Sequence, residues 1–149
     1  MAETHSPDEE RRVGTQGIVD KWLAERQQML VLYCQVAGLE PFEPDKPSKQ
    51  LLKDYCQVLV DYMAFGHFEV YDRISQGEER RKAVLDIASE IYPRAVEVTE
   101  LVVAFNDKYD TSDHEQEMGH LDKDLSVLGE ELASLVEMED RLVAVMQKQ

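Results

Sequence analysis

The chain has 149 residues, of which 31 are acidic and 16 are basic, and its formal net charge is −15. This excess of acids argues against direct binding to nucleic acid or to an anionic membrane surface, because both reward basic residues. The length, a hydrophobic content of 43% and only 7 glycines and 5 prolines indicate one globular domain rather than a loop-rich all-β fold. No apolar run is long enough to span a membrane and no signal peptide is recognisable, so the expected compartment is the cytoplasm.

The first part of the chain divides into a polar tail and a long helix. Residues 1–13 are expected to form a flexible N-terminal tail, followed by a single domain over residues 14–149. A first helix is predicted from Thr15 to Ala37, before Gly38. Its buried face should consist of residues spaced three and four apart, namely Val19, Trp22, Arg26, Met29, Tyr33 and Val36. The segment 39–47 holds three prolines and is predicted to be a semi-rigid connector.

A second helix, predicted from Ser48 to Ile74 with a bend at Gly66, carries two stripes. One stripe should meet the core and comprises Leu52, Cys56, Leu59, Met63, Gly66 and Val70. The opposite stripe interleaves acids with aromatics, namely Asp54, Asp61, Phe65, Phe68 and Asp72. Apolar groups ringed by carboxylates indicate a surface that binds a basic protein partner. The alternative is that Gly66 rotates the helix and buries both phenylalanines.

The second half of the chain predicts two more helices. The third spans about residues 79–109 and contains Pro93, which should kink it or split it. Its core positions are Val84, Ala88, Ile91, Ala95, Val98, Val102, Phe105 and Tyr109. Ser112 and Glu115 fit a capping box, so the fourth helix should start near Asp113. Its core positions are Leu121, Leu125, Leu128, Leu132, Leu135, Glu139, Leu142 and Met146. The pattern predicts an all-α fold, an antiparallel up-down-up-down four-helix bundle with a proline-kinked third helix.

Two core positions carry charges, Arg26 in the first helix and Glu139 in the fourth. An unpaired buried charge is strongly unfavourable, so each needs a partner or a route to water. Up-down-up-down packing brings His67 to about the level of Glu139. We therefore expect an internal polar cluster of Arg26, His67, Tyr71 and Glu139. In the alternative, Arg26 and Glu139 extend to the rim of the bundle.

The sequence shows no catalytic motif and no complete metal site. Di-metal bundles use Glu-x-x-His on two helices, and this chain has one such pair, Glu117 and His120. Nucleophile elbows, Walker loops and dinucleotide glycine motifs are absent from the sequence. We therefore expect no enzyme activity, no cofactor and no metal. A helical bundle that binds a small molecule or a metal through the internal polar cluster stays open, as does a general regulatory adaptor.

Three blocks of the sequence resemble the Rsd/AlgQ family of bacterial anti-sigma factors. They are VDKWLAERQQMLVLY (19–33), LKDYCQVLVDYMAFGHFEVYD (52–72) and EMEDRLV (137–143), and the resemblance covers about residues 15–147. It implies a four-helix bundle that binds region four of the primary sigma factor, the helix-turn-helix domain that reads the −35 promoter element. Binding would withdraw this sigma factor from core RNA polymerase and thereby regulate transcription. A monomer or a weak dimer is expected.

The resemblance also implies a role for Asp61 in binding the sigma factor, and the residues around it are expected to complete the surface. Asp61 matches an acid that meets a sigma arginine, and Phe65 and Phe68 would supply the apolar anchor beside it. Asp20 and Asp72 are expected to join this surface. The chain departs from the family in one respect, because members commonly carry Ser-Ala before Gly-His-Phe where this chain has Ala64 and Phe65. The bulky Phe65 is expected to reshape the surface and to alter the affinity or the sigma target.

Overall fold

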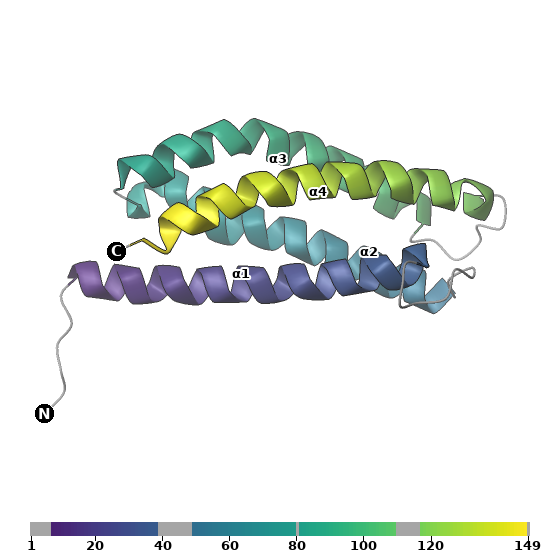
Figure 1. Ribbon diagram of the computed structural model, residues 1–149, viewed down its shortest axis with the longest axis horizontal. Helices are drawn as coiled ribbons and strands as arrows, with labels where there is room; N and C mark the ends of the chain where they lie inside the picture. Colours follow the sequence, from purple (N-terminus) through teal and green to yellow (C-terminus); the bar gives the residue numbers. More distant parts are fainter. Residues whose placement is uncertain (1–6, 39–48, 80, 110–116, 149) are drawn as a thin grey trace, which may run out of the picture.

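The computed structural model describes residues 7–38, 49–79, 81–109 and 117–148. Four long helices build it: α1 (Pro7–Ala37), α2 (Lys49–Phe65), α3 (Lys82–Tyr109) and α4 (Leu121–Met146) (Figure 1). Two π-helical segments, η1 (Gly66–Tyr71) and η2 (Ile74–Glu78), follow α2, and one 3-10 turn, η3 (Glu117–His120), leads into α4. The described ranges contain no strand, and the predicted all-α four-helix fold is confirmed.

Contacts between helices set the direction of the chain in the bundle. The Tyr33 hydroxyl of α1 donates to the Leu125 carbonyl of α4 over 2.8 Å, whereas Arg26 lies 3.5 Å from Glu139. Moving back along α1 therefore means moving forward along α4, and the two helices are antiparallel. The contacts of α3 with α4 and of α1 with α2 reverse in the same way, and Figure 1 shows the chain passing back and forth along the bundle.

The core follows the predicted periodicity closely. All core positions predicted for the second, third and fourth helices are buried, and in the first helix only Tyr33 is half-buried. The structure adds five buried hydrophobic residues that the periodicity missed, namely Tyr55, Tyr62, Tyr71, Ile74 and Val143. Repeated steps of three and four place one stripe of each helix against its neighbours, and burial of that stripe is the main source of stability. None of the described helices has the length and apolar character required to cross a bilayer.

The helix boundaries differ from the sequence predictions at several points. α1 begins at Pro7 rather than at Thr15, so residues 7–13 of the predicted tail are helical. Proline favours a first helical turn for two reasons. Its φ is already fixed near the helical value, and it loses no hydrogen bond there because N–H groups in the first turn have no acceptor within the helix. α3 continues through Pro93, and the predicted kink stays a prediction. The proline-rich connector and the capping box at Ser112 lie outside the described residues.

Gly66 marks the point where α2 changes into η1. A Cβ atom at this position would lie 3.6 Å from Trp22 Nε1 and 3.8 Å from the Tyr71 ring, which are ordinary van der Waals distances. In a π-helix the hydrogen bonds run over five residues, as from the Asp72 N–H to the His67 carbonyl, and each turn takes in one more residue. The side chains after Gly66 are therefore rotated relative to a continuous α-helix.

Candidate functional site

Two acids of the proposed binding surface, Asp20 and Asp61, are exposed and held in place by glutamines one turn earlier. Gln16 Nε2 donates to Asp20 Oδ1 over 2.8 Å, and Gln57 Nε2 donates to Asp61 Oδ1 over 3.0 Å. An amide is neutral, so it orients the carboxylate without cancelling its charge. Asp61 thus presents a pre-oriented negative charge to solvent.

Phe65 lies one turn after Asp61 and faces α1. Its ring is half-buried, and the Lys21 ammonium lies 5.4 Å from the ring centroid, a distance at which a cation–π interaction forms. Lys21 follows Asp20 in the chain, so this contact connects the part of α1 that carries Asp20 with the part of α2 that carries Phe65. We call the surface made by Asp20, Asp61 and Phe65 the α1–α2 face.

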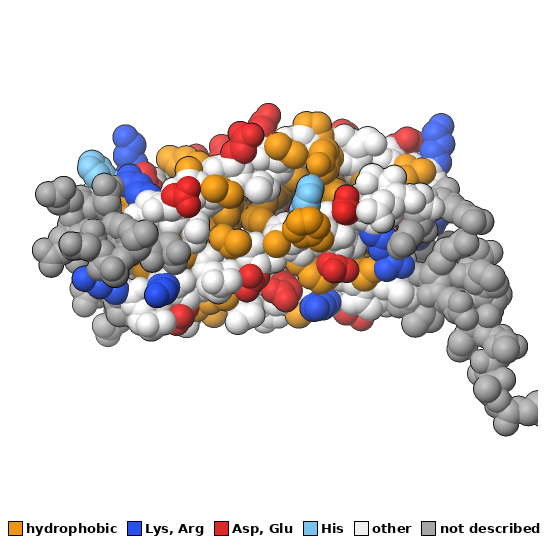
Figure 2. Space-filling model, turned by 180° about the vertical axis from the view of Figure 1, so that it is seen from behind, with side chains coloured by type: hydrophobic (Ala, Val, Ile, Leu, Met, Phe, Trp, Pro, Cys, Tyr) orange, Lys and Arg blue, Asp and Glu red, His pale blue; other side chains and the backbone are white. Residues whose placement is uncertain are grey.

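Phe68 lies toward α3 rather than with Phe65. Its side chain is 63% exposed, which excludes the alternative that Gly66 buries both phenylalanines. Its ring meets the His67 ring edge-on at 4.8 Å, and His67 stacks on Tyr92 of α3 at 6.3 Å. Hydrophobic side chains gather on this side of the molecule (Figure 2). The rotation introduced by η1 explains why the predicted stripe is divided between the two sides of α2.

Asp72 follows η1 directly and is half-buried. Its carboxylate accepts a 3.4 Å hydrogen bond from Gln76 Nε2, and its backbone carbonyl accepts one of 3.0 Å from the Ser75 hydroxyl. These contacts stay within the turn that begins η2. They hold Asp72 at the end of the α2–η1 segment.

A buried polar cluster joins α1, α2 and α4. Arg26 Nε donates to the Tyr62 hydroxyl over 3.1 Å, the Tyr62 hydroxyl donates to Glu139 Oε1 over 2.5 Å, and Arg26 Nη2 lies 3.5 Å from the same oxygen. Arg26 Nη1 also bonds the exposed Asp140. Arg26 and Glu139 are only 7% and 2% exposed, so the alternative that both extend to the rim is wrong. Each charge is instead paired inside the bundle, as burial requires.

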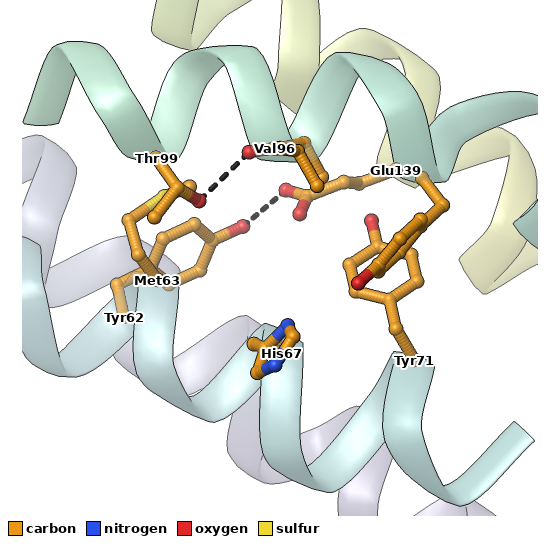
Figure 3. A pocket seen from close by; sticks show the side chains of 10 residues that line it. Tyr62, Met63, His67, Tyr71, Val96, Thr99 and Glu139 are labelled. Atoms are coloured by element: carbon orange, nitrogen blue, oxygen red, sulfur yellow. Dashed lines mark hydrogen bonds between the residues drawn. The ribbon is translucent and has the colours of Figure 1, made fainter. Parts of the chain in front are cut away.

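Tyr71 and His67 border this cluster rather than complete its hydrogen-bond chain. The buried Tyr71 hydroxyl lies near Glu139 (Figure 3). The Tyr71 ring packs edge-on against Trp22. His67 is exposed, and its ring lies against Phe68 and Tyr92. A cavity of about 20 Å³ lies between Tyr71, His67 and Glu139, which is room for about one water molecule.

Burial controls the ionisation of the cluster. It raises the pKa of Glu139 to about 7, although the hydrogen bond from Tyr62 and the charge of Arg26 act in the opposite direction. Burial also raises the pKa of the Tyr62 and Tyr71 hydroxyls well above the usual value, so both keep their protons. Tyr62 is therefore a permanent donor to Glu139.

Tyr62 is the member of the cluster that sequence reasoning missed. Its position falls between the two stripes of the second helix, and a tyrosine counts toward either an apolar or a polar pattern. The sequence did contain one signal, because two buried charges at core positions require further polar groups nearby to hydrogen-bond them. Among the described residues, no three His, Cys, Asp or Glu side chains gather as a metal site requires.

Comparisons with known proteins give a consistent result. The profile of a family described as "Regulator of RNA polymerase sigma(70) subunit, Rsd/AlgQ" matches residues 1–147. A "Regulator of sigma D" from Yersinia enterocolitica (serotype O:8 / biotype 1B) is 31% identical over 134 residues, which cover 87% of this chain and 80% of the relative. A protein of the same name from Salmonella paratyphi A is 33% identical over 144 residues, which cover 92% and 86%. No solved structure gives a significant match. The chain therefore belongs to the Rsd/AlgQ family of regulators of the RNA polymerase sigma(70) subunit.

Proposed function

We propose that the chain is an anti-sigma factor that acts by stoichiometric binding, without catalysis. It binds region four of the primary sigma factor and withdraws that factor from core RNA polymerase. Membership of the Rsd/AlgQ family and relatives named "Regulator of sigma D" support a sigma factor as the partner. Because RNA polymerase works in the cytoplasm, the proposal places the chain there.

The observation that carries the proposal is the exposed, oriented carboxylate of Asp61 beside the half-buried ring of Phe65. A domain that reads DNA presents a basic surface to phosphates, and an acidic bundle competes for that surface. A charge-assisted bond between Asp61 and an arginine would contribute about 1.5–3 kcal/mol when water is excluded. Phe65 would add apolar contact at the centre of the same interface.

Substitution of Asp61 tests the proposal directly. We expect Asp61→Ala to weaken binding to the region-four domain at least about tenfold, because the lost charge-assisted bond is worth that factor or more. The affinity is measured by titration calorimetry, with circular dichroism to show that the helical content is unchanged.

Asp122 of α4 supplies a control on a helix that carries no part of the α1–α2 face. Like Asp61, it is exposed. Asp122→Ala removes the same charge and should change the affinity less than about twofold, as expected for a charge outside the contact. Wild-type affinity in Asp61→Ala, or an equal loss in both variants, would remove Asp61 from the interface.

A further inference from the structure

A groove runs along the other side of α2, between the α2–η1 segment and α3. Its volume is about 470 Å³, and its lining is mostly apolar. Four large side chains in it are unusually exposed, namely Phe68 at 63%, Val103 at 49%, Tyr92 at 41% and Val96 at 39%. Figure 2 shows hydrophobic side chains gathered on this side of the molecule. A contiguous exposed apolar strip of this kind indicates a binding surface.

The shape of the groove fits a helix. Tyr92, Val96 and Val103 lie on α3 at steps of four and seven, so they form one stripe along the helix. Tyr92 and Val103 are eleven residues apart, which corresponds to about 16 Å, or about three helical turns. Phe68 and its neighbours on α2 and η1 form the opposite wall. Two helical walls with apolar side chains between them are the usual seat of an amphipathic helix.

The charge of the groove selects a basic occupant. Glu100 is part of the lining, whereas none of the described lining residues is a lysine or an arginine. The whole chain carries a net charge of −15. A second copy of the chain would bring the same negative charge to this surface and would be repelled, whereas a helix edged with lysine and arginine would be attracted.

We propose that this groove seats one basic amphipathic helix of about three turns from region four of the sigma factor. This inference rests on the proposed function. Val60 and Ala64 line the groove, and the residues that follow them, Asp61 and Phe65, belong to the α1–α2 face. The two surfaces therefore adjoin along α2. A domain built of several helices contacts both surfaces at once, with one helix in the groove and a neighbouring helix over Asp61.

Two valines of nearly equal exposure supply the test. Val103 in the groove is 49% exposed, and Val127 on α4 is 45% exposed and takes no part in the groove. Replacement by lysine adds the same positive charge at either site and disturbs no buried contact. Val103→Lys should weaken binding to the isolated region-four domain at least about tenfold, because it opposes both the apolar contact and the charge preference. Val127→Lys should stay within about twofold, as expected for a charge outside the groove.

Phe68→Ala is a second groove variant and should weaken the same binding at least about fivefold, because an aromatic anchor is truncated. Wild-type affinity in Val103→Lys while Asp61→Ala is impaired would overturn the groove and leave the proposed function standing. No binding by the wild-type chain would overturn both. Equal losses of affinity in Val103→Lys and Val127→Lys would mean that the change in net charge, and not the groove, causes the effect. Self-association of the chain alone that Val103→Lys abolishes would assign the groove to a second copy. Either of these last two results overturns the inference.

Discussion

Glu139 places a carboxyl group in the middle of an otherwise apolar stripe of α4, where it is 2% exposed. The groups around it come from three other segments, namely Arg26 of α1, Tyr62 of α2 and Tyr71 of η1, with Asp140 next to it on α4. Two of these neighbours bear charge, one of each sign. Burial of the Glu139 carboxyl group therefore carries a cost in desolvation, and the bonds from Arg26 and Tyr62 offset it. Both contributions can be measured.

The pKa of Glu139 predicts a pH dependence of stability. Burial raises its pKa from the ordinary value of 4.5 to about 7 in the folded chain, so the native state binds more protons than the unfolded state between these values. Stability should fall as the pH rises from about 4.5 to about 7, by an amount on the order of 3 kcal/mol, and should then level off. Glu139→Gln removes this contribution. In urea unfolding, the free energy of unfolding of the variant relative to that of wild type should therefore rise as the pH increases across this range.

The free energy of unfolding of wild type and of Glu139→Gln should be measured over the same pH range at constant ionic strength, and the two curves compared. Other groups titrate equally in wild type and in Glu139→Gln, so the difference between the two curves isolates Glu139. Parallel curves from about pH 5 to about pH 8 would contradict the raised pKa.

The ion pair inside the cluster predicts a coupled effect of two substitutions. Arg26→Met and Glu139→Leu each leave one buried charge without its partner, whereas the double variant leaves neither. The double variant should be less destabilised than the sum of the single variants, by at least about 1 kcal/mol in denaturant unfolding. Strictly additive effects would mean that the two side chains do not interact in solution.

Residue positions were predictable from the sequence where the helical period held. Charges at two core positions identified Arg26 and Glu139 as partners, and both are buried together. Phe68 was assigned to the same face as Phe65 because a constant period was assumed. The π-helical turn after Gly66 changes that period, and nothing in the residue pattern other than the glycine marks the change.

At the element scale, α1 and α4 approach closely where Gly129 faces Tyr33. The Tyr33 hydroxyl crosses to bond the Leu125 carbonyl over 2.8 Å, and a Cβ atom at position 129 would clash with this hydroxyl. Gly129→Ala should therefore destabilise the bundle by about 1–3 kcal/mol, because the tyrosine or the helix must move. The expected readout is a lower melting temperature.

Gly17 of α1 is the control for this substitution. It is exposed within a helix, and a Cβ atom there meets nothing within 4 Å. Gly17→Ala should stabilise the chain by about 0.5–1 kcal/mol through helix propensity. If both alanine variants raise the melting temperature alike, the close approach of α1 and α4 at Gly129 is wrong.

The helices themselves were largely predictable, because the residues that recur at steps of three and four are the ones that are buried. The predicted core positions of the second, third and fourth helices are all buried, including Glu139. The ends were less predictable. α1 starts at Pro7 because proline suits a first turn, although the polar residues that follow it carry no core signal.

At the scale of the whole molecule, the net charge of −15 should steer the chain toward a basic partner. Binding to region four should therefore weaken as salt rises, by at least about tenfold between about 0.05 and about 0.5 M, because salt screens exposed charges. Titrations at a series of salt concentrations measure the slope. A flat profile would mean that apolar contacts of Phe65 and the groove dominate the complex.

The motif blocks predicted the family, and the comparisons confirm it. Composition and charge alone excluded nucleic acid as a favourable partner but left several classes of protein partner open. The surfaces on the two sides of α2 became visible only in the structure, because their separation depends on how Phe65 and Phe68 turn away from each other.

Sedimentation velocity of the full chain mixed with the region-four domain of the primary sigma factor shows whether the two proteins form a complex. At micromolar concentrations we expect one species of 1:1 stoichiometry, which should be absent when Asp61→Ala and Val103→Lys are combined. Separate sedimentation of the two folded wild-type components at those concentrations would contradict the proposed function.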